Sequence, residues 1–346
     1  MLTSPSAELP RTRSRRGPAS WNPPLGGLAV GAQLAHTRSL GVKHRAMADS
    51  QLHTLLEGGA FFESPRWHDG QWWVSDFYRH LVLSVSASGE PREVLEVEEQ
   101  PSGLGWMPDG SMLVVSMRDH RILRWSADTG VTQHADVSEY CGGHLNDIVV
   151  DTHGRAYVGN FGFDLMSGGD PAPANLIRVD PDGGASIAAE DLLFPNGSVI
   201  TPDGKTLIVG ETAGARYTAF TINHDGSLSD RRVWAQLAPT PEITTLAETF
   251  SKLQFGPDGC GLDAENHIWC ADEVNARCVR IAPGGDIVGE IKAPDGLDFF
   301  ACMLGGADGR TLLMCAAPDF AEVNRTAARE AVLLTTSVDI PHGGLP

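Results

Sequence analysis

Six short segments of the chain share one pattern, in which a tight turn built on Gly or Asn is followed by an apolar strand. The turn residues recur about every 40 to 62 residues and are Gly70, Gly110, Gly154, Gly204, Asn266 and Gly309. Repeats of this length, each with a hairpin signal, are typical of a β-propeller with one four-stranded blade per repeat. The sequence therefore predicts an all-β fold, a six-bladed β-propeller with four-stranded blades around a central axial tunnel. The same part of every blade then meets at the axis.

The chain divides by composition into a short basic segment and a long acidic one. The first 46 of the 346 residues hold seven Lys or Arg and one acid, and they show no helix or strand period. We therefore expect 1–46 to be a disordered N-terminal extension and 47–346 to be the propeller domain, with about 50 residues per blade.

The net charge and the cysteines indicate which classes of partner and which cellular compartment to expect. The formal net charge is −18, and the acids lie almost entirely in 47–346, so we expect no nucleic-acid binding and no membrane binding. The six cysteines form no CxxC pair, which favours free thiols, a reducing compartment and a soluble cytoplasmic protein. Organelle or export targeting by the Arg- and Ser-containing residues 1–46 is the alternative.

Polar side chains recur seven or eight residues before the turn residues, where the strand leading into each hairpin begins. Four of the six equivalent positions carry a side-chain oxygen: Glu63, Asn146, Asn196 and Asp258. If these strands are innermost, the four side chains converge on the axis. Asn-Gly and Asp-Gly are also ordinary turn dipeptides, so any one of these residues alone would indicate little.

Two carboxylates and two amide carbonyls would make a cage of hard oxygens with a charge of −2. Ca²⁺ prefers several oxygen ligands in flexible geometry, so the predicted cofactor is a divalent metal ion, with Ca²⁺ favoured over Zn²⁺, Mn²⁺ or Mg²⁺. The positions carry no Cys or His, so the pattern does not indicate a zinc site of the Cys/His type.

Four segments carry a family resemblance: Glu63-Ser64-Pro65-Arg66-Trp67, Asn146-Asp147 with 151–158, Phe194-Pro195-Asn196-Gly197 with 201–209, and Pro257-Asp258-Gly259 with 262–264. In this order and spacing they resemble the senescence marker protein, gluconolactonase and luciferin-regenerating enzyme family, from about Leu52 to about Thr336. The resemblance implies a six-bladed propeller with an axial divalent metal, usually Ca²⁺, in proteins that hydrolyse lactones, with relatives that hydrolyse organophosphates. It implies that Glu63, Asn196 and Asp258 are metal ligands. Asn146 would touch the substrate or the metal, and Asp258 would also be the general base.

One departure from the family bears on the substrate. Sugar-lactone members often have Arg two residues before the axial Asn, where this chain has His144. Arg offers a fixed fork of donors to hydroxyl groups, so its replacement favours a less polar lactone. His144 is a candidate for substrate binding or for acid–base chemistry, with a structural His as the alternative. Trp106 and Phe161 are candidates for the lining of the tunnel mouth, with blade packing as the alternative.

These observations predict a metal-dependent hydrolase of ester bonds, a gluconolactonase-like lactonase that acts on a small lactone or ester. The metal would polarise the carbonyl and Asp258 would take a proton from the attacking water, while Asn146 would orient the ligand. The alternatives are an organophosphate triesterase that uses the same site and a propeller that binds a metal or ligand without turnover. No serine-hydrolase, zincin, phosphate-loop or dinucleotide motif is present in the sequence.

Overall fold

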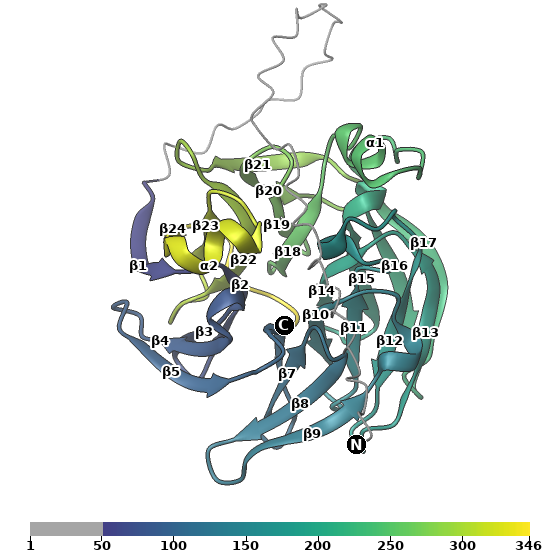
Figure 1. Cartoon of the computed structure of the whole chain (residues 1–346), viewed down its shortest axis with the longest axis horizontal. Helices are drawn as coiled ribbons and strands as arrows, with labels where there is room; N and C mark the ends of the chain where they lie inside the picture. Colours follow the sequence, from purple (N-terminus) through teal and green to yellow (C-terminus); the bar gives the residue numbers. More distant parts are fainter. Residues whose placement is uncertain (1–50) are drawn as a thin grey trace, which may run out of the picture. The chain divides into compact units, whose positions relative to one another are not determined.

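The computed structural model describes residues 51–346, which form a ring of six four-stranded antiparallel sheets around a central axis (Figure 1). The predicted six-bladed propeller is therefore confirmed. The innermost strands of neighbouring blades contact one another all the way round the ring. The predicted boundary between residues 46 and 47 lies outside the described residues.

The blades follow one another in chain order, and each runs from an innermost to an outermost strand. Blades 1 to 3 are β2 (Phe62–His68), β3 (Gln71–Asp76), β4 (Leu81–Val85), β5 (Pro91–Glu96); β6 (Pro101–Trp106), β7 (Met112–Ser116), β8 (Arg121–Ser126), β9 (Gly130–Asp136); and β10 (Leu145–Val150), β11 (Ala156–Asn160), β12 (Ala174–Val179), β13 (Ala185–Leu192). Blades 4 to 6 are β14 (Pro195–Ile200), β15 (Thr206–Glu211), β16 (Arg216–Ile222), β17 (Leu228–Gln236); β18 (Pro257–Leu262), β19 (Ile268–Asp272), β20 (Arg277–Ile281), β21 (Ile287–Lys292); and β22 (Asp298–Gly305), β23 (Thr311–Ala317), β24 (Ala331–Ser337), β1 (His53–Gly59).

The six repeated turn residues all adopt the left-handed backbone conformation that the repeat pattern requires. Their φ angles are 76°, 85°, 80° and 68° for the four glycines of the first four repeats and 59° and 70° for Asn266 and Gly309. Glycine reaches this region without a steric penalty, and Asn tolerates it better than most residues. The turn between the first two strands of each blade is therefore dictated locally by the sequence.

The ring is closed by the first described strand. β1 pairs antiparallel with β24, with His53 opposite Thr335 and Glu57 opposite Val332. A strand from the start of the chain thus completes the sixth blade, which leaves no unpaired seam between the ends of the propeller.

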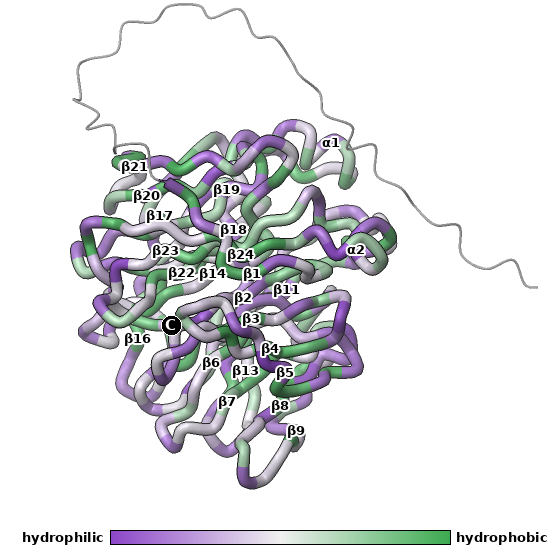
Figure 2. The backbone as a smooth tube through the Cα atoms, turned by 90° about the vertical axis from the view of Figure 1, so that its left-hand side faces the viewer, coloured by the Kyte–Doolittle hydropathy of each residue, from purple (hydrophilic) through white to green (hydrophobic). Residues whose placement is uncertain are grey.

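The two faces of the propeller differ. The connections that follow the second and fourth strands lie at the face where the innermost strands begin. Within residues 51–346 they hold the helices α1 (Leu246–Ser251) and α2 (Glu322–Ala328) and all four 3₁₀ helices: η1 (Phe77–Arg79), η2 (Ser138–Tyr140), η3 (Leu165–Ser167) and η4 (Thr212–Gly214). The side view places α1 and α2 on one face and the C-terminus on the opposite face (Figure 2). There Leu345 pairs with Ile200, and His342 pairs with Asp263. The face with the helices is called the helical face below.

The core lies between and within the sheets. Every residue of β10, β14 and β18 is buried, as expected for strands enclosed by neighbouring blades. All six cysteines are free thiols, and five of them are buried, in agreement with the prediction from the sequence. Among residues 51–346 no helix is long and apolar enough to cross a membrane.

Candidate active site

The four polar residues singled out by the repeat occupy one structural position. Glu63, Asn146, Asn196 and Asp258 are each the second residue of an innermost strand: β2, β10, β14 and β18. All four lie at the helical face of the ring, and each residue is between 6% and 9% exposed. The common register that the sequence predicted for these side chains is therefore present in the fold.

A local irregularity of the sheet follows each of these residues. The pairing between the first two strands shifts between Glu63 and Arg66, and equivalent shifts occur at the same place in the other blades. A β-bulge bends its strand and re-aims a side chain, and bulges are frequent beside active sites. Here the irregularity recurs in every blade at the start of the innermost strand.

The glycines after Asn196 and Asp258 lie inside strands rather than in turns. A Cβ atom on Gly197 would come within 2.4 Å of the carbonyl oxygen of Asp258, and one on Gly259 would come within 2.4 Å of the Ala301 side chain. These distances are too short for any side chain. Asn-Gly and Asp-Gly here reflect the close approach of neighbouring innermost strands, so they are not turn dipeptides.

The two axial carboxyl groups lie close enough to perturb each other. Burial raises the pKa of Asp258 well above its usual range, and the negative charges of Glu63 and Glu273 raise it further. Burial also raises the pKa of Glu63 to about 8, against the opposing hydrogen bond from the backbone N–H of Ser64. Two desolvated acids that each disfavour the other's charge are a site where an added cation would be stabilised.

The nearest guanidinium does not meet that need. The guanidinium of Arg66 donates to the side chain of Asp147 at 2.5 Å. It also donates to three backbone carbonyls, each at 3.0 Å, those of Pro65, Leu104 and Ile148. It ties blades 1, 2 and 3 together and balances Asp147. No guanidinium is hydrogen-bonded to the axial pair within residues 51–346, and a side-chain hydrogen bond from Asn196 only partly offsets the raised pKa of Asp258.

The donor atoms suit a hard cation. Within residues 51–346 no three His, Cys, Asp or Glu side chains gather closely enough to hold a metal ion, so an ion here would also need the amide oxygens. Asn196 donates from its Nδ2 to the hydroxyl of Thr212 at 3.2 Å. That hydroxyl donates in turn to the carbonyl of Pro257 at 2.7 Å, which leaves the Asn196 carbonyl oxygen as the group available to a ligand.

His144 and Phe161 adjoin paired residues of blade 3, because Leu145 lies opposite Asn160 in the sheet. The backbone N–H of Phe161 donates to the carbonyl of His144 at 2.9 Å, and their rings are 5.9 Å apart. The ring of Phe161 also packs against Phe194 at 4.6 Å. Burial lowers the pKa of His144, and the positive charge of Arg118 lowers it further. A neutral imidazole therefore lies against an aromatic wall next to an axial amide.

Trp106 does not belong to this group, which corrects the sequence-based assignment. It is the last residue of β6, whose first residues are the ones at the helical face. Its ring stacks on His68 at 4.2 Å and meets Trp73 edge-on at 5.5 Å. Because a strand advances about 3.3 Å per residue, Trp106 lies at the opposite end of the axis from the axial side chains.

The structure adds residues to the site that the repeat did not reveal. Glu273 directly follows β19, and its charge contributes to the raised pKa of both axial carboxyl groups. Its own pKa is raised to about 7, by burial first and then by Asp272. Arg118, two residues after β7, supplies the fixed cation that the sequence had not placed near His144.

A repeated backbone contact could have indicated these positions. In blades 1 to 5, the first residue after the second strand donates its backbone N–H to the carbonyl of the residue just before the innermost strand. The five pairs are Phe77 to Phe61, Met117 to Gln100, Phe161 to His144, Thr212 to Phe194 and Glu273 to Gly256. Residues just after each second strand therefore border the axial side chains. A count from the turn residue of each repeat would therefore have located a second set of positions around the axial side chains.

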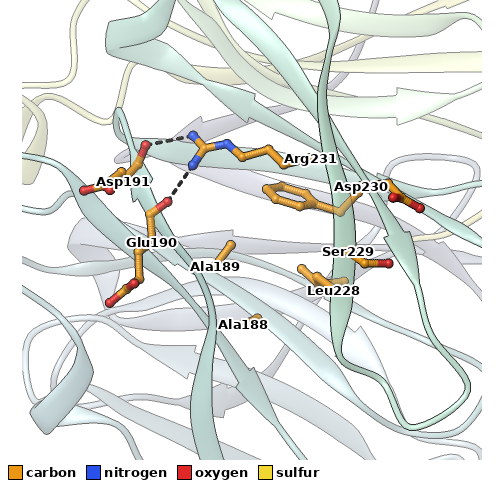
Figure 3. Close-up of a pocket in the computed structure, with 9 residues that line it drawn as sticks. Ala188, Ala189, Glu190, Asp191, Leu228, Ser229, Asp230 and Arg231 are labelled. Carbon is orange, nitrogen blue, oxygen red and sulfur yellow. Dashed lines mark hydrogen bonds between the residues drawn. The ribbon is translucent and has the colours of Figure 1, made fainter.

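A surface pocket at the outer edge of the ring is not part of this arrangement. It has a volume of about 380 Å³ and lies between β13 and the outer strands of blade 4. Figure 3 shows Arg231 crossing it to the backbone carbonyls of Glu190 and Asp191, at 2.7 and 2.8 Å. Those hydrogen bonds join two blades at their outer edges, and none of the axial side chains lines the pocket.

The fold and site define a six-bladed propeller whose innermost strands present buried carboxyl and amide groups at one end of the axis. Residues 61–318 match the SMP-30/Gluconolactonase/LRE-like region, and the chain belongs to this family.

Individual relatives are distant in sequence. The chain is 26% identical over 204 residues to 6-deoxy-6-sulfogluconolactonase of Pseudomonas putida, a match that covers 57% of this chain and 62% of that protein. It is 25% identical over 189 residues to regucalcin of Danio rerio, covering 54% and 59%. The chain thus matches less than two thirds of the length of either relative. A calcium-binding regucalcin of Agrobacterium tumefaciens shares the fold, with a TM-score of 0.69, 19% identity and coverage of 86% and 97%.

Proposed function

We propose that the chain is a metal-dependent lactonase that opens a small lactone by attack of water on the carbonyl carbon. One observation carries the proposal: two buried carboxyl groups and two amides share one register at the axis, and no described cation is committed to them. Family membership and the names of the two relatives, one of them a lactonase, agree with it.

The proposed ligands of the metal ion are Glu63, Asn196 and Asp258, with Asn146 at the ion or at the substrate. Once bound, a divalent ion such as Ca²⁺ supplies a Lewis acid for the substrate carbonyl. The buried carboxylates fit such an ion because their mutual repulsion is relieved by positive charge. Zn²⁺, Mn²⁺ and Mg²⁺ are the other ions to compare.

The remaining roles fall to residues that the fold holds in place. Asp258 accepts a proton from the attacking water at its carboxylate, and Asn146 donates from its amide to the oxygen on which negative charge develops. His144 and Phe161 contact the substrate, the imidazole as a neutral hydrogen-bonding group and the phenyl ring as an apolar wall. The predicted partner is thus a small lactone or ester, and a cytoplasmic location stays a prediction.

A lactone panel tests the proposal. Hydrolysis of aliphatic, aromatic and sugar lactones is followed by acid release with Ca²⁺, with each alternative ion and after chelation. We expect turnover that disappears on chelation and returns with one ion. A matched variant, Asp225→Asn, changes an exposed turn acid and is expected to behave as wild type. Turnover of phosphotriesters alone would replace the lactonase assignment, and no turnover of any ester with any ion would leave a binding protein.

A further inference from the structure

One guanidinium on the helical face lies beside the residues proposed to contact the substrate. Arg118 is the second residue after β7, and its neighbour Met117 accepts the backbone N–H of Leu145 at 3.1 Å. Leu145 stands between His144 and Asn146 in the sequence. The end of β7 is therefore hydrogen-bonded to the segment that carries both substrate candidates.

The side chain of Arg118 reaches across the helical face. Its Nη2 lies 2.9 Å from a carboxylate oxygen of Glu322, the first residue of α2. Arg118 belongs to blade 2 and Glu322 to the connection within blade 6, so the ion pair spans blade 1 between them. Tyr78 of blade 1 lies close to both charges and to Glu63, and its hydroxyl donates to the carbonyl of Phe320 at 2.5 Å. The ion pair therefore lies over blade 1 on the helical face, the face at which Glu63 also lies.

Most of the guanidinium is uncommitted. Among residues 51–346 its one hydrogen bond is the contact from Nη2 to Glu322, so its other N–H groups have no protein acceptor. Arg66 provides the contrast, because all three of its nitrogens are engaged. The Arg118 side chain is 30% exposed and that of Glu322 is 43% exposed. An ion pair this accessible contributes little stability, so exchanging its carboxylate for another costs little.

We propose that Arg118 determines substrate specificity by binding a negatively charged substituent on the lactone, in exchange for Glu322. The substrate class is then a small lactone whose ring or side chain carries a carboxylate, sulfonate or phosphate group. A planar guanidinium matches such groups with two parallel hydrogen bonds, which a hydroxyl group cannot accept equally well. The ring would rest against Phe161, with its anionic substituent directed toward Arg118. This inference rests on the proposed lactonase function.

A matched pair of substrates isolates the charge. γ-Butyrolactone and the same ring bearing a 5-carboxylate differ only in the anionic group, and kcat/KM is measured for both at saturating metal. In Arg118→Met we expect kcat/KM for the carboxylate lactone to fall about 10- to 100-fold, the effect of losing a charge-assisted hydrogen bond. The neutral lactone should change less than about twofold. Arg118→Lys should keep part of the preference.

Two further variants separate recognition from structural support. Glu322→Gln frees the guanidinium and should raise kcat/KM for the carboxylate lactone. If the ion pair served only to hold α2 in place, Glu322→Gln would instead lower kcat/KM as much as Arg118→Met does. Arg121→Met removes a neighbouring arginine that pairs with Asp119 at 3.3 Å, and it should alter neither substrate. Equal losses for both lactones in Arg118→Met, or no loss for either, would overturn the inference while the lactonase function stood.

Failure of the proposed function is distinguishable from failure of this inference. If wild type hydrolyses neither lactone, binding of tetrahydrofuran-2-carboxylate, a ring carboxylate that cannot be hydrolysed, is measured by ligand-detected NMR. Weaker binding to Arg118→Met than to wild type or Arg121→Met would support an anion-binding residue in a protein that is not a lactonase. Equal binding to all three proteins would overturn it.

Discussion

The amide nitrogen of Asn196 donates to the hydroxyl of Thr212 at 3.2 Å, and this hydroxyl donates to the carbonyl of Pro257, the residue before Asp258. One side chain thus links the axial amide of blade 4 to the start of the innermost strand of blade 5. It fixes which end of the Asn196 amide faces the axis, because the nitrogen is engaged and the carbonyl oxygen is left over. Partners that orient ligands in this way tune the affinity of metal sites.

Thr212→Val keeps the shape of the side chain and removes the hydroxyl group. We expect metal affinity to fall about 10- to 100-fold, as is typical when an orienting partner of a ligand is lost. Folding stability should fall by about 1–3 kcal/mol, because the buried hydroxyl makes two hydrogen bonds and its removal leaves both partners without it. Calorimetric titration of Ca²⁺ measures the first quantity. Thr335→Val, on the third strand of blade 6 and away from the axis, is the control. Unchanged affinity in Thr212→Val would show that the Asn196 amide does not contact the ion.

Asp258→Asn separates metal binding from proton transfer. The variant retains an oxygen ligand but loses a charge and a base, so we expect weakened metal binding and a fall in kcat of about 10²- to 10⁴-fold. Glu63→Gln should mainly raise the metal concentration that is needed for activity. The measurement is kcat at saturating metal for both variants. Full recovery of Asp258→Asn by excess Ca²⁺ would reduce Asp258 to a ligand only.

The pH dependence of stability follows from the buried position of Glu63. Its pKa is raised from 4.5 to about 8, so the folded metal-free protein holds this proton more tightly than the unfolded chain does. The stabilisation is fully present below about pH 4.5 and is lost as the pH rises through about 8. Asp258 shifts in the same direction, because its pKa is also raised. We therefore expect the metal-free protein to lose stability between pH 5 and about 8.

Chemical denaturation with a chelator present, at several pH values, measures this loss. Glu63→Gln should make the fall in stability smaller, because the neutral amide has no proton to lose, while Asp258 and Glu273 still contribute. Saturating Ca²⁺ should also offset the loss at high pH, since the ion replaces the proton. Glu265→Gln is the matched control: this exposed acid pairs with Arg280 and its pKa is lowered, so its removal should leave the fall between pH 5 and 8 in place. A flat profile in the wild-type protein would contradict the burial argument.

The sequence was sufficient to locate residues that lie a fixed number of positions before the turn residue in each repeat. Glu63, Asn146, Asn196 and Asp258 were found because their distance to the turn residue is set by the length of one hairpin, which varies little. The pairing of β1 with β24 could be expected on a different ground, because a closed ring leaves no unpaired strand edge between the ends of the propeller.

Residues just after the second strands were missed because their side chains differ in type from blade to blade. Thr212, Glu273 and Arg118 stand seven or eight residues after the turn residue of their repeat, so the count alone could have located them, but no shared residue type marks them in the sequence. Glu322 joins Arg118 across blade 1 over a separation of 204 residues, a contact that only the closed ring creates.

A substitution at Trp106 tests whether the substrate enters from the helical face or from the opposite face. The sequence assigned it to the tunnel mouth because it is an aromatic residue on an innermost strand, but its strand ends there, far from Asn146. Trp106→Ala removes the stacked contact with His68 and the edge contact with Trp73, and it should lower stability by at least about 1 kcal/mol.

We expect kcat/KM of Trp106→Ala on any accepted lactone to stay within about twofold of wild type, because the change lies at the other end of the propeller. Phe161→Leu, beside His144 and Phe194, should instead raise KM by weakening the apolar wall while the protein stays folded. Thermal unfolding and steady-state kinetics on both variants measure the contrast. If Trp106→Ala raised KM more than Phe161→Leu did, substrate would have to approach from the face that bears the C-terminus, and the helical face would lose its role as the entrance.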